Sequence, residues 1–161
     1  MKRFNILQLI FIMLTIAIMI CIFMFSSENS SQSSDTSGTF TKTLINFLYN
    51  DFNSMPEYHQ TEIYNNISHI IRKTAHFSIY TTLGLFSSLA VGKRKFFSIK
   101  NLAVIMFCFL YARSDEIHQY FVPGRACMFN DVILDTFGSI TGVLISMLII
   151  KIISKKIAVP E

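Results

Sequence analysis

A long apolar run near the start of the chain limits what this sequence can fold into. Residues 6–25 contain only two polar side chains, Gln8 and Thr15. Twenty residues in a helix span about 30 Å, which is the thickness of a bilayer's hydrocarbon core. A cleaved signal peptide has a shorter apolar region and a small-x-small cleavage site, and residues 24–27 offer no such site. The run therefore predicts a retained transmembrane helix at about residues 4–25.

Three further apolar segments follow, at about residues 75–91, 96–119 and 131–152. Hydrophobic residues make up 52% of the chain and charged residues only 15%, whereas a soluble domain has roughly 25% charged residues. The third segment contains no helix breaker before Pro123, so its helix should continue through Gln119. We therefore predict an all-α, polytopic integral membrane protein with four transmembrane helices in a single domain, residues 1–161.

The stretch between the first two predicted spans is mostly polar and contains two short amphipathic segments. Residues 26–41 are rich in Ser and Thr, which favours a flexible segment. Residues 43–52 and 57–71 place apolar side chains at helical spacing, and Pro56 separates the two. Both are too short to cross a bilayer. We predict short amphipathic helices that lie on the membrane or cap the helical bundle.

The basic residues are distributed unevenly between the two sides of the predicted membrane. With four spans, the side that holds both termini carries nine of the fourteen basic residues and only one acidic residue, Glu161. Short loops rich in Lys and Arg stay in the cytoplasm. We therefore predict a multi-pass cell-membrane protein with both termini cytoplasmic and outer loops at residues 26–74 and 120–130. This asymmetry accounts for the net charge of +4, and we do not expect nucleic acid as a partner.

Polar residues gather where three predicted helices meet the outer face. His76 opens the second span, residues 115–119 close the third, and Asp131 and Asp135 open the fourth. Ionisable groups at membrane depth are costly unless a site needs them. We predict that the helices bring these groups together in one polar site. Its candidate residues are His76, Asp115, Glu116, His118, Gln119, Arg125, Asp131 and Asp135.

Two local motifs support this arrangement. Gly138 and Gly142 share a helix face with Asp135, and such a small-xxx-small pair lets another helix approach closely. The carboxylate of Asp135 should therefore point into the bundle rather than toward lipid. Pro123 and Gly124 occupy the central positions of a predicted type II turn between the third and fourth spans.

The chemistry of these residues leaves several roles open. Arg72, Lys73 and Arg125 lie on the outer side against the charge rule and suit an anion such as a lipid phosphate. No cofactor is evident, although a divalent metal could be ligated by His76, His118, Asp115, Glu116, Asp131 and Asp135. The alternative is a purely structural network, in which Arg125 forms a salt bridge with Asp131 or Glu116.

At these residues the chain resembles the VanZ family of membrane proteins. The similarity covers nearly the whole chain, although Arg113 and residues 126–129 match no family pattern. It rests on Arg72-Lys73-x-x-His76, on Asp115-Glu116-x-His118-Gln119-x-Phe121-Val122-Pro123-Gly124-Arg125, and on Asp131-Val132-x-x-Asp135-x-x-Gly138. The resemblance implies a small integral membrane protein associated with glycopeptide resistance of the teicoplanin type.

Three classes of function follow from the residues and the resemblance. The first is a resistance or binding protein whose outer site engages an anionic lipid, a lipid-linked cell-wall precursor or a glycopeptide. The second, which is the main alternative, is an interfacial enzyme that uses a metal or a His–carboxylate pair to act on a lipid phosphate or ester. A transporter or proton relay is a third class, for which four spans are few.

Overall fold

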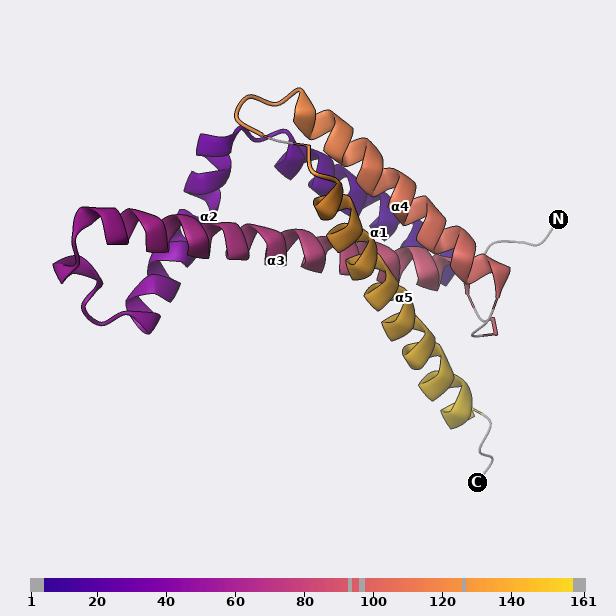
Figure 1. Ribbon diagram of the computed structural model, residues 1–161. Coiled ribbons are helices and arrows are strands. Elements are labelled where there is room, and N and C mark those ends of the chain that lie inside the picture. Colours follow the sequence, from indigo (N-terminus) through magenta and orange to yellow (C-terminus); the bar gives the residue numbers. More distant parts are fainter. Residues whose placement is uncertain (1–4, 93, 96–97, 126, 158–161) are drawn as a thin grey trace.

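The computed structural model describes residues 5–92, 94–95, 98–125 and 127–157, and in this part of the chain it contains helices and no strand (Figure 1). The all-α prediction is therefore confirmed for the described residues. The elements are α1 (Ile6–Ser26), α2 (Ser30–Leu48), the 3-10 helix η1 (Phe52–Ser54), α3 (Glu57–Val91), α4 (Ile99–Tyr120) and α5 (Phe129–Ile157).

Two of the helices, rather than the four predicted, are long and apolar enough to cross a membrane. They are α1 and residues 129–154 of α5. Most of α1 is exposed and apolar, as at Leu7, Met13 and Met24, which suits contact with lipid. In α3 and α4, polar and charged side chains interrupt the apolar sequence, so neither helix contains a run as apolar as those in α1 and α5. Residues 4, 96 and 97, which the predicted spans included, lie outside the described residues.

The polar stretch after α1 is helical, which corrects the prediction of a flexible segment at residues 26–41. Asn29 caps α2, because its side chain accepts a hydrogen bond from the backbone N–H of Gln32 at 2.9 Å. Hydroxyls within α2 donate back to carbonyls four residues earlier, as Thr41 does to Ser37, so they need no other partner. Thr41 and Ile45 are buried, and α2 packs against α3. This tertiary contact outweighs the weak helix propensity of Ser and Thr.

Helix α3 is continuous over 35 residues. It joins the amphipathic segment predicted at 57–71 to the span predicted at 75–91, between which the sequence contains no helix breaker. At 1.5 Å per residue it is about 52 Å long, more than the roughly 40–45 Å of a whole bilayer. A helix of this length is longer than one crossing of a bilayer needs. Figure 1 shows α2 beside the first half of α3.

Glycines bring α3 and α5 into backbone contact, as the small-xxx-small pair predicted. A Cβ at Gly138 would lie 2.6 Å from the carbonyl oxygen of Phe77, and one at Gly142 would overlap the carbonyl oxygen of Thr81. Gly84 of α3 meets the backbone of Ser139 in the same way. Because no side chain separates the helices here, α3 and α5 fix each other's rotation. The buried core beside this contact comprises Ile22, Tyr80, Leu83, Val104, Cys108, Ala112, Val132 and Val143.

The connection between α4 and α5 contains the predicted turn. Gly124 has φ +76°, the left-handed value that a type II turn requires at its third position. The N–H of Arg125 donates to the carbonyl oxygen of Val122 at 3.1 Å and closes the turn. In Figure 1 this turn and the junction of α1 with α2 lie at one end of the helices, opposite the start of α1 and the end of α5.

Candidate functional site

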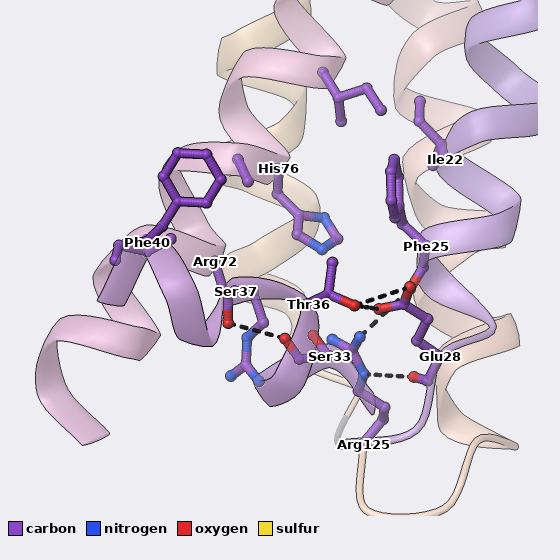
Figure 2. Close-up of a pocket in the computed structure, with 13 residues that line it drawn as sticks. Ile22, Phe25, Glu28, Ser33, Thr36, Ser37, Phe40, Arg72, His76 and Arg125 are labelled. Carbon is purple, nitrogen blue, oxygen red and sulfur yellow. Dashed lines mark hydrogen bonds between the residues drawn. The ribbon is translucent and has the colours of Figure 1, made fainter. Parts of the chain in front are cut away.

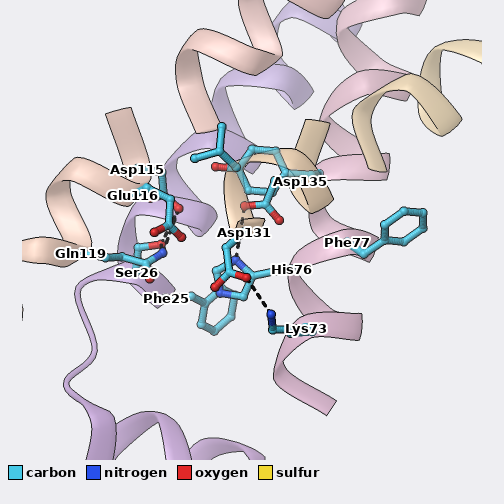
Figure 3. A network of polar contacts seen from close by, with 12 residues as sticks. Phe25, Ser26, Lys73, His76, Phe77, Asp115, Glu116, Gln119, Asp131 and Asp135 are labelled. Atoms are coloured by element: carbon cyan, nitrogen blue, oxygen red, sulfur yellow. Dashed lines mark hydrogen bonds and ion pairs between the residues drawn. The ribbon is translucent and has the colours of Figure 1, made fainter. Parts of the chain in front are cut away.

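The end of the molecule that carries the α4–α5 turn contains a buried cluster of three ionisable residues (Figure 3). His76 comes from α3, Asp115 from α4 and Asp135 from α5. One nitrogen or oxygen of each lies within 4.8 Å of those of the other two. The glycine contacts explain the convergence, because Gly138 is one turn along α5 from Asp135 and meets α3 next to His76. The structure thus brings together three of the predicted site residues.

Asp135 is the most enclosed of the three. Its side chain is 0% exposed, and neither carboxylate oxygen forms a hydrogen bond with the described residues. Its ion-pair partner is His76, whose Nδ1 lies 3.8 Å from Oδ2, beyond hydrogen-bond distance. A buried carboxylate without hydrogen bonds is costly.

Asp115 belongs to a small hydrogen-bond network that reaches α1. The hydroxyl of Ser26 donates to Oδ2 of Asp115 at 2.9 Å, and Nε2 of Gln119 donates to the same oxygen at 3.2 Å. Gln119 also donates to the Ser26 hydroxyl at 3.2 Å. This network holds the carboxylate of Asp115 in place. From the sequence, Ser26 was the first residue of the polar stretch after the first span, and no local pattern reveals a partner 89 residues away.

Glu116 and Asp131 have structural partners near the cluster. Glu116 is 2% exposed, and its Oε2 accepts a hydrogen bond from the backbone N–H of Met128 at 3.0 Å. This contact ties the loop before α5 to α4. Asp131 forms an ion pair with Lys73, whose Nζ lies 2.8 Å from Oδ1. The structural alternative had supposed a salt bridge between Arg125 and Asp131. In the structure the partner of Asp131 is Lys73 instead.

Arg125 instead binds the end of α1. Its Nε donates to the carbonyl oxygen of Glu28 at 3.1 Å, and its Nη2 donates to that of Phe25 at 3.5 Å. Partial burial, followed by the nearby positive charge of Arg72, lowers the pKa of Arg125. The guanidinium groups of Arg72 and Arg125 thus lie near each other. Among the described residues, neither forms an ion pair with a carboxylate. An anion between them would relieve this repulsion.

Two cavities meet at these basic side chains. The first has a volume of about 280 Å³ and a wall that is almost entirely apolar, with Phe25, Phe40 and Ile71 among its residues (Figure 2). The second, of about 150 Å³, is more polar. Arg72, His76 and Arg125 line both. The second is also lined by Lys73, Glu116, Gln119, Gly124, Met128, Asp131, Leu134 and Asp135.

One predicted site residue, His118, lies apart from the cluster. Its ring stacks on that of Phe23 in α1, with 4.6 Å between ring centroids. Its Nδ1 is buried without a hydrogen-bond partner among the described residues, and His118 lines neither cavity. His118 precedes Gln119 by one position and therefore points about 100° away around α4. The sequence placed both on one face, and the contact with Phe23 shows that they face different neighbours.

Two residues near the site were not among the candidates. The hydroxyl of Tyr80 is buried and has no hydrogen-bond partner among the described residues. Tyr80 lies one turn after His76, and its place on the same face of α3 was the signal that could have included it. Glu28 lines the apolar cavity and accepts a hydrogen bond from Thr36. No pattern in the sequence pointed to Glu28.

These features define a helical protein of membrane type, in which two helices have the length and apolarity of membrane spans and a polar cluster is buried among three helices. A family model described as VanZ/LLP1 matches residues 11–151. The chain belongs to the VanZ/LLP1 family, as the motifs at residues 72–76, 115–125 and 131–138 had indicated. No curated protein and no solved structure matches the chain.

Proposed function

We propose that this protein binds an anionic membrane lipid or lipid-linked cell-wall precursor at the outer face of the cell membrane. The observation that carries the proposal is the meeting of an apolar and a polar cavity at Arg72, His76 and Arg125. A lipid has the same division, since its charged headgroup adjoins a hydrocarbon chain. A binding site for such a molecule needs basic side chains at the boundary of the two environments.

The basic residues at that boundary favour a phosphate or similar group. Arginine presents a planar fork of N–H donors that matches phosphate oxygens. Lys73 is already engaged by Asp131 at 2.8 Å, so Arg72 and Arg125 are the cations available to a ligand. Arg125 uses its Nε for the carbonyl of Glu28, which fixes the orientation of its guanidinium. Such fixed orientation reduces the entropic cost of binding.

The size of the apolar cavity favours a lipid over an antibiotic. A volume of about 280 Å³ lies just below the range of roughly 300–1,000 Å³ in which drug-sized ligands bind. It suits a segment of a hydrocarbon chain rather than an entire glycopeptide. In this proposal, a contribution to glycopeptide resistance arises from the lipid or precursor that the site engages, and not from capture of the drug.

The proposal includes a topology of four membrane spans with both termini cytoplasmic. Helices α3 and α4 pack between or beside α1 and α5, and at 35 and 22 residues each is long enough to cross. Several of their polar side chains, such as Ser88 of α3 and Asp115 and Gln119 of α4, are buried, so that protein rather than lipid surrounds them. The distribution of Lys and Arg then places the cluster at the outer face.

Lipid binding by the purified full-length chain tests the proposal. Native mass spectrometry in detergent, with a metal chelator present, would compare phosphatidic acid with neutral diacylglycerol. We expect the protein to retain phosphatidic acid preferentially. Arg72→Gln should weaken retention by about tenfold or more, because a hydrogen bond to a charged group contributes about 1.5–3 kcal/mol.

Lys42→Gln is the matched control for this experiment. Lys42 is an exposed cation of α2 and lines neither cavity, so its loss should leave lipid retention unchanged. Equal retention of the two lipids by the wild-type protein, or full retention by the Arg72→Gln variant, would contradict the proposed site.

A further inference from the structure

We propose that His76, Asp115 and Asp135 form a binding site for one divalent transition metal ion, of the zinc or manganese type. The site goes beyond the proposed lipid binding and does not depend on it. Three observations carry it: the convergence of the three ligand groups, the absence of hydrogen bonds to Asp135, and the open side of the cluster.

The convergence places suitable donors at nearly the separation that an ion requires. The three donor atoms lie within 4.8 Å of one another. Bonds of about 2.0–2.2 Å from zinc to nitrogen or oxygen place two ligands of a tetrahedral ion about 3.4 Å apart. Side-chain rotations that shorten the separations of the donor atoms by about 1 Å would therefore complete the site. The three residues come from three helices, and glycines fix the packing of the two that carry His76 and Asp135.

The buried carboxylate of Asp135 provides independent support. It is 0% exposed, lines the polar cavity, and has no hydrogen-bond partner for either oxygen among the described residues. Polar groups in such a position are almost always satisfied. A metal ion would satisfy the carboxylate and balance the two negative charges that Asp115 and Asp135 carry when ionised. Asp131, one turn earlier, already has Lys73 as its partner and needs no ion.

The type of ion follows from the ligands. Imidazole suits zinc, iron, nickel and copper, whereas carboxylates suit manganese, calcium and magnesium. One imidazole with two carboxylates is a set of three protein ligands, and catalytic zinc sites keep a further position open for water or substrate. His76 and Asp135 line the polar cavity together with Arg72 and Arg125, so an ion held by them would have its further position on the side of this cavity.

The location of the open position connects the metal to the ligand chemistry of the cavity. An anionic oxygen bound there would face the metal on one side and the two guanidinium groups on the other. If the lipid proposal holds, this oxygen belongs to the headgroup. A metal-bound water at this position is also what the metal-assisted form of the interfacial enzyme considered from the sequence would use.

Metal binding by the purified full-length protein tests the inference without any lipid. The protein in detergent would be stripped with a chelator, dialysed, and titrated with Zn²⁺ alone and with Mn²⁺ alone. We expect one equivalent of at least one of these ions, measured by elemental analysis and calorimetry. We also expect the ion to raise the thermal-unfolding midpoint, because a ligand that binds only the folded state stabilises it.

Variants locate the bound ion. Asp135→Asn keeps the side-chain volume and should weaken binding by more than about 100-fold, beyond the 10–100-fold effect of losing an outer-shell partner. His76→Gln should do the same and guards against a fold defect specific to position 135. Asp131→Asn is the matched control, since Asp131 lines the same cavity but is paired with Lys73. It should bind the ion like the wild type.

Two results would overturn the inference. The first is a wild-type protein that stays well below one equivalent of either ion, which would indicate that His76 pairs with the carboxylates directly. The second is a folded Asp135→Asn variant that binds the ion with wild-type affinity. Because no lipid is present, neither result bears on lipid retention, which is measured with a chelator present.

Discussion

Asp131 and Asp135 lie one turn apart on α5, and the side chains opposite them give them different roles. Lys73 neutralises Asp131 at 2.8 Å, while Asp135 has only the more distant imidazole of His76. Asp131 therefore has a structural role in holding α3 and α5 together, whereas Asp135 belongs to the candidate site. At the scale of residues, the distinction depends on α3, which supplies both Lys73 and His76 three positions apart.

The Lys73–Asp131 pair should contribute measurably but modestly to stability. Their side chains are 33% and 26% exposed, so solvent screens the pair in part. We expect a coupling energy of about 1 kcal/mol, at the upper end of the range for exposed pairs. The measurement is a double-mutant cycle on the thermal-unfolding midpoint, with Lys73→Met, Asp131→Asn and the combined variant. Strictly additive effects of the two substitutions would show that the pair contributes nothing.

The sequence predicted which residue types the site contains better than it predicted their contacts. The cluster of His76, Asp115 and Asp135 follows from helix faces and from the glycine pair, both of which are local patterns. The contacts of Arg125 with the end of α1 and of His118 with Phe23 do not. They depend on where α1 packs, and an apolar helix with few polar positions gives no indication of its rotation.

At the scale of elements, the α3–α5 contact positions the site. A Cβ at position 142 would overlap the carbonyl oxygen of Thr81 and lie 2.6 Å from the backbone nitrogen of Leu85. Backbone atoms cannot move aside as a side-chain end can. Any residue larger than glycine at this position must therefore push the two helices apart, together with His76 and Asp135.

Gly142→Ala should destabilise the protein by about 1–3 kcal/mol, the usual cost of overpacking. The measurement is the thermal-unfolding midpoint of the purified variant in detergent. Gly38→Ala is the control, because a Cβ there would meet only the hydroxyl of Tyr64 at an ordinary 3.4 Å. It should be neutral or slightly stabilising, since alanine favours helix more than glycine does. A wild-type midpoint for Gly142→Ala would show that the helices are not held by this contact.

Helix α2 is the element that the sequence did not predict over its full length. Its Ser- and Thr-rich first half lacks the apolar periodicity on which helix prediction depends. The capping pair of Asn29 and Gln32 was the local signal available. What decides the structure is the contact with α3 through Thr41 and Ile45, and α3 itself extends further than a membrane span requires.

At the scale of the whole molecule, two of the three helices that carry the polar cluster, α3 and α4, are less apolar than a typical membrane span. α1 and α5 keep the apolarity of membrane spans, while α3 and α4 lose it through the side chains that form or flank the cluster. In the proposed four-span topology, hydropathy along the chain understates how much of this protein a membrane surrounds. The central claim is that four helices hold the cluster at the outer face of the membrane.

Cysteine accessibility in intact cells tests this claim most directly. In a background without Cys21, Cys108 and Cys127, single cysteines would replace Tyr58, which is 72% exposed at the start of α3, and Lys95, which is exposed between α3 and α4. A membrane-impermeant maleimide should label position 58 in intact cells and position 95 only after the cells are opened. Labelling of position 95 in intact cells, or protection of position 58, would contradict the topology and would remove the cluster from the outer face.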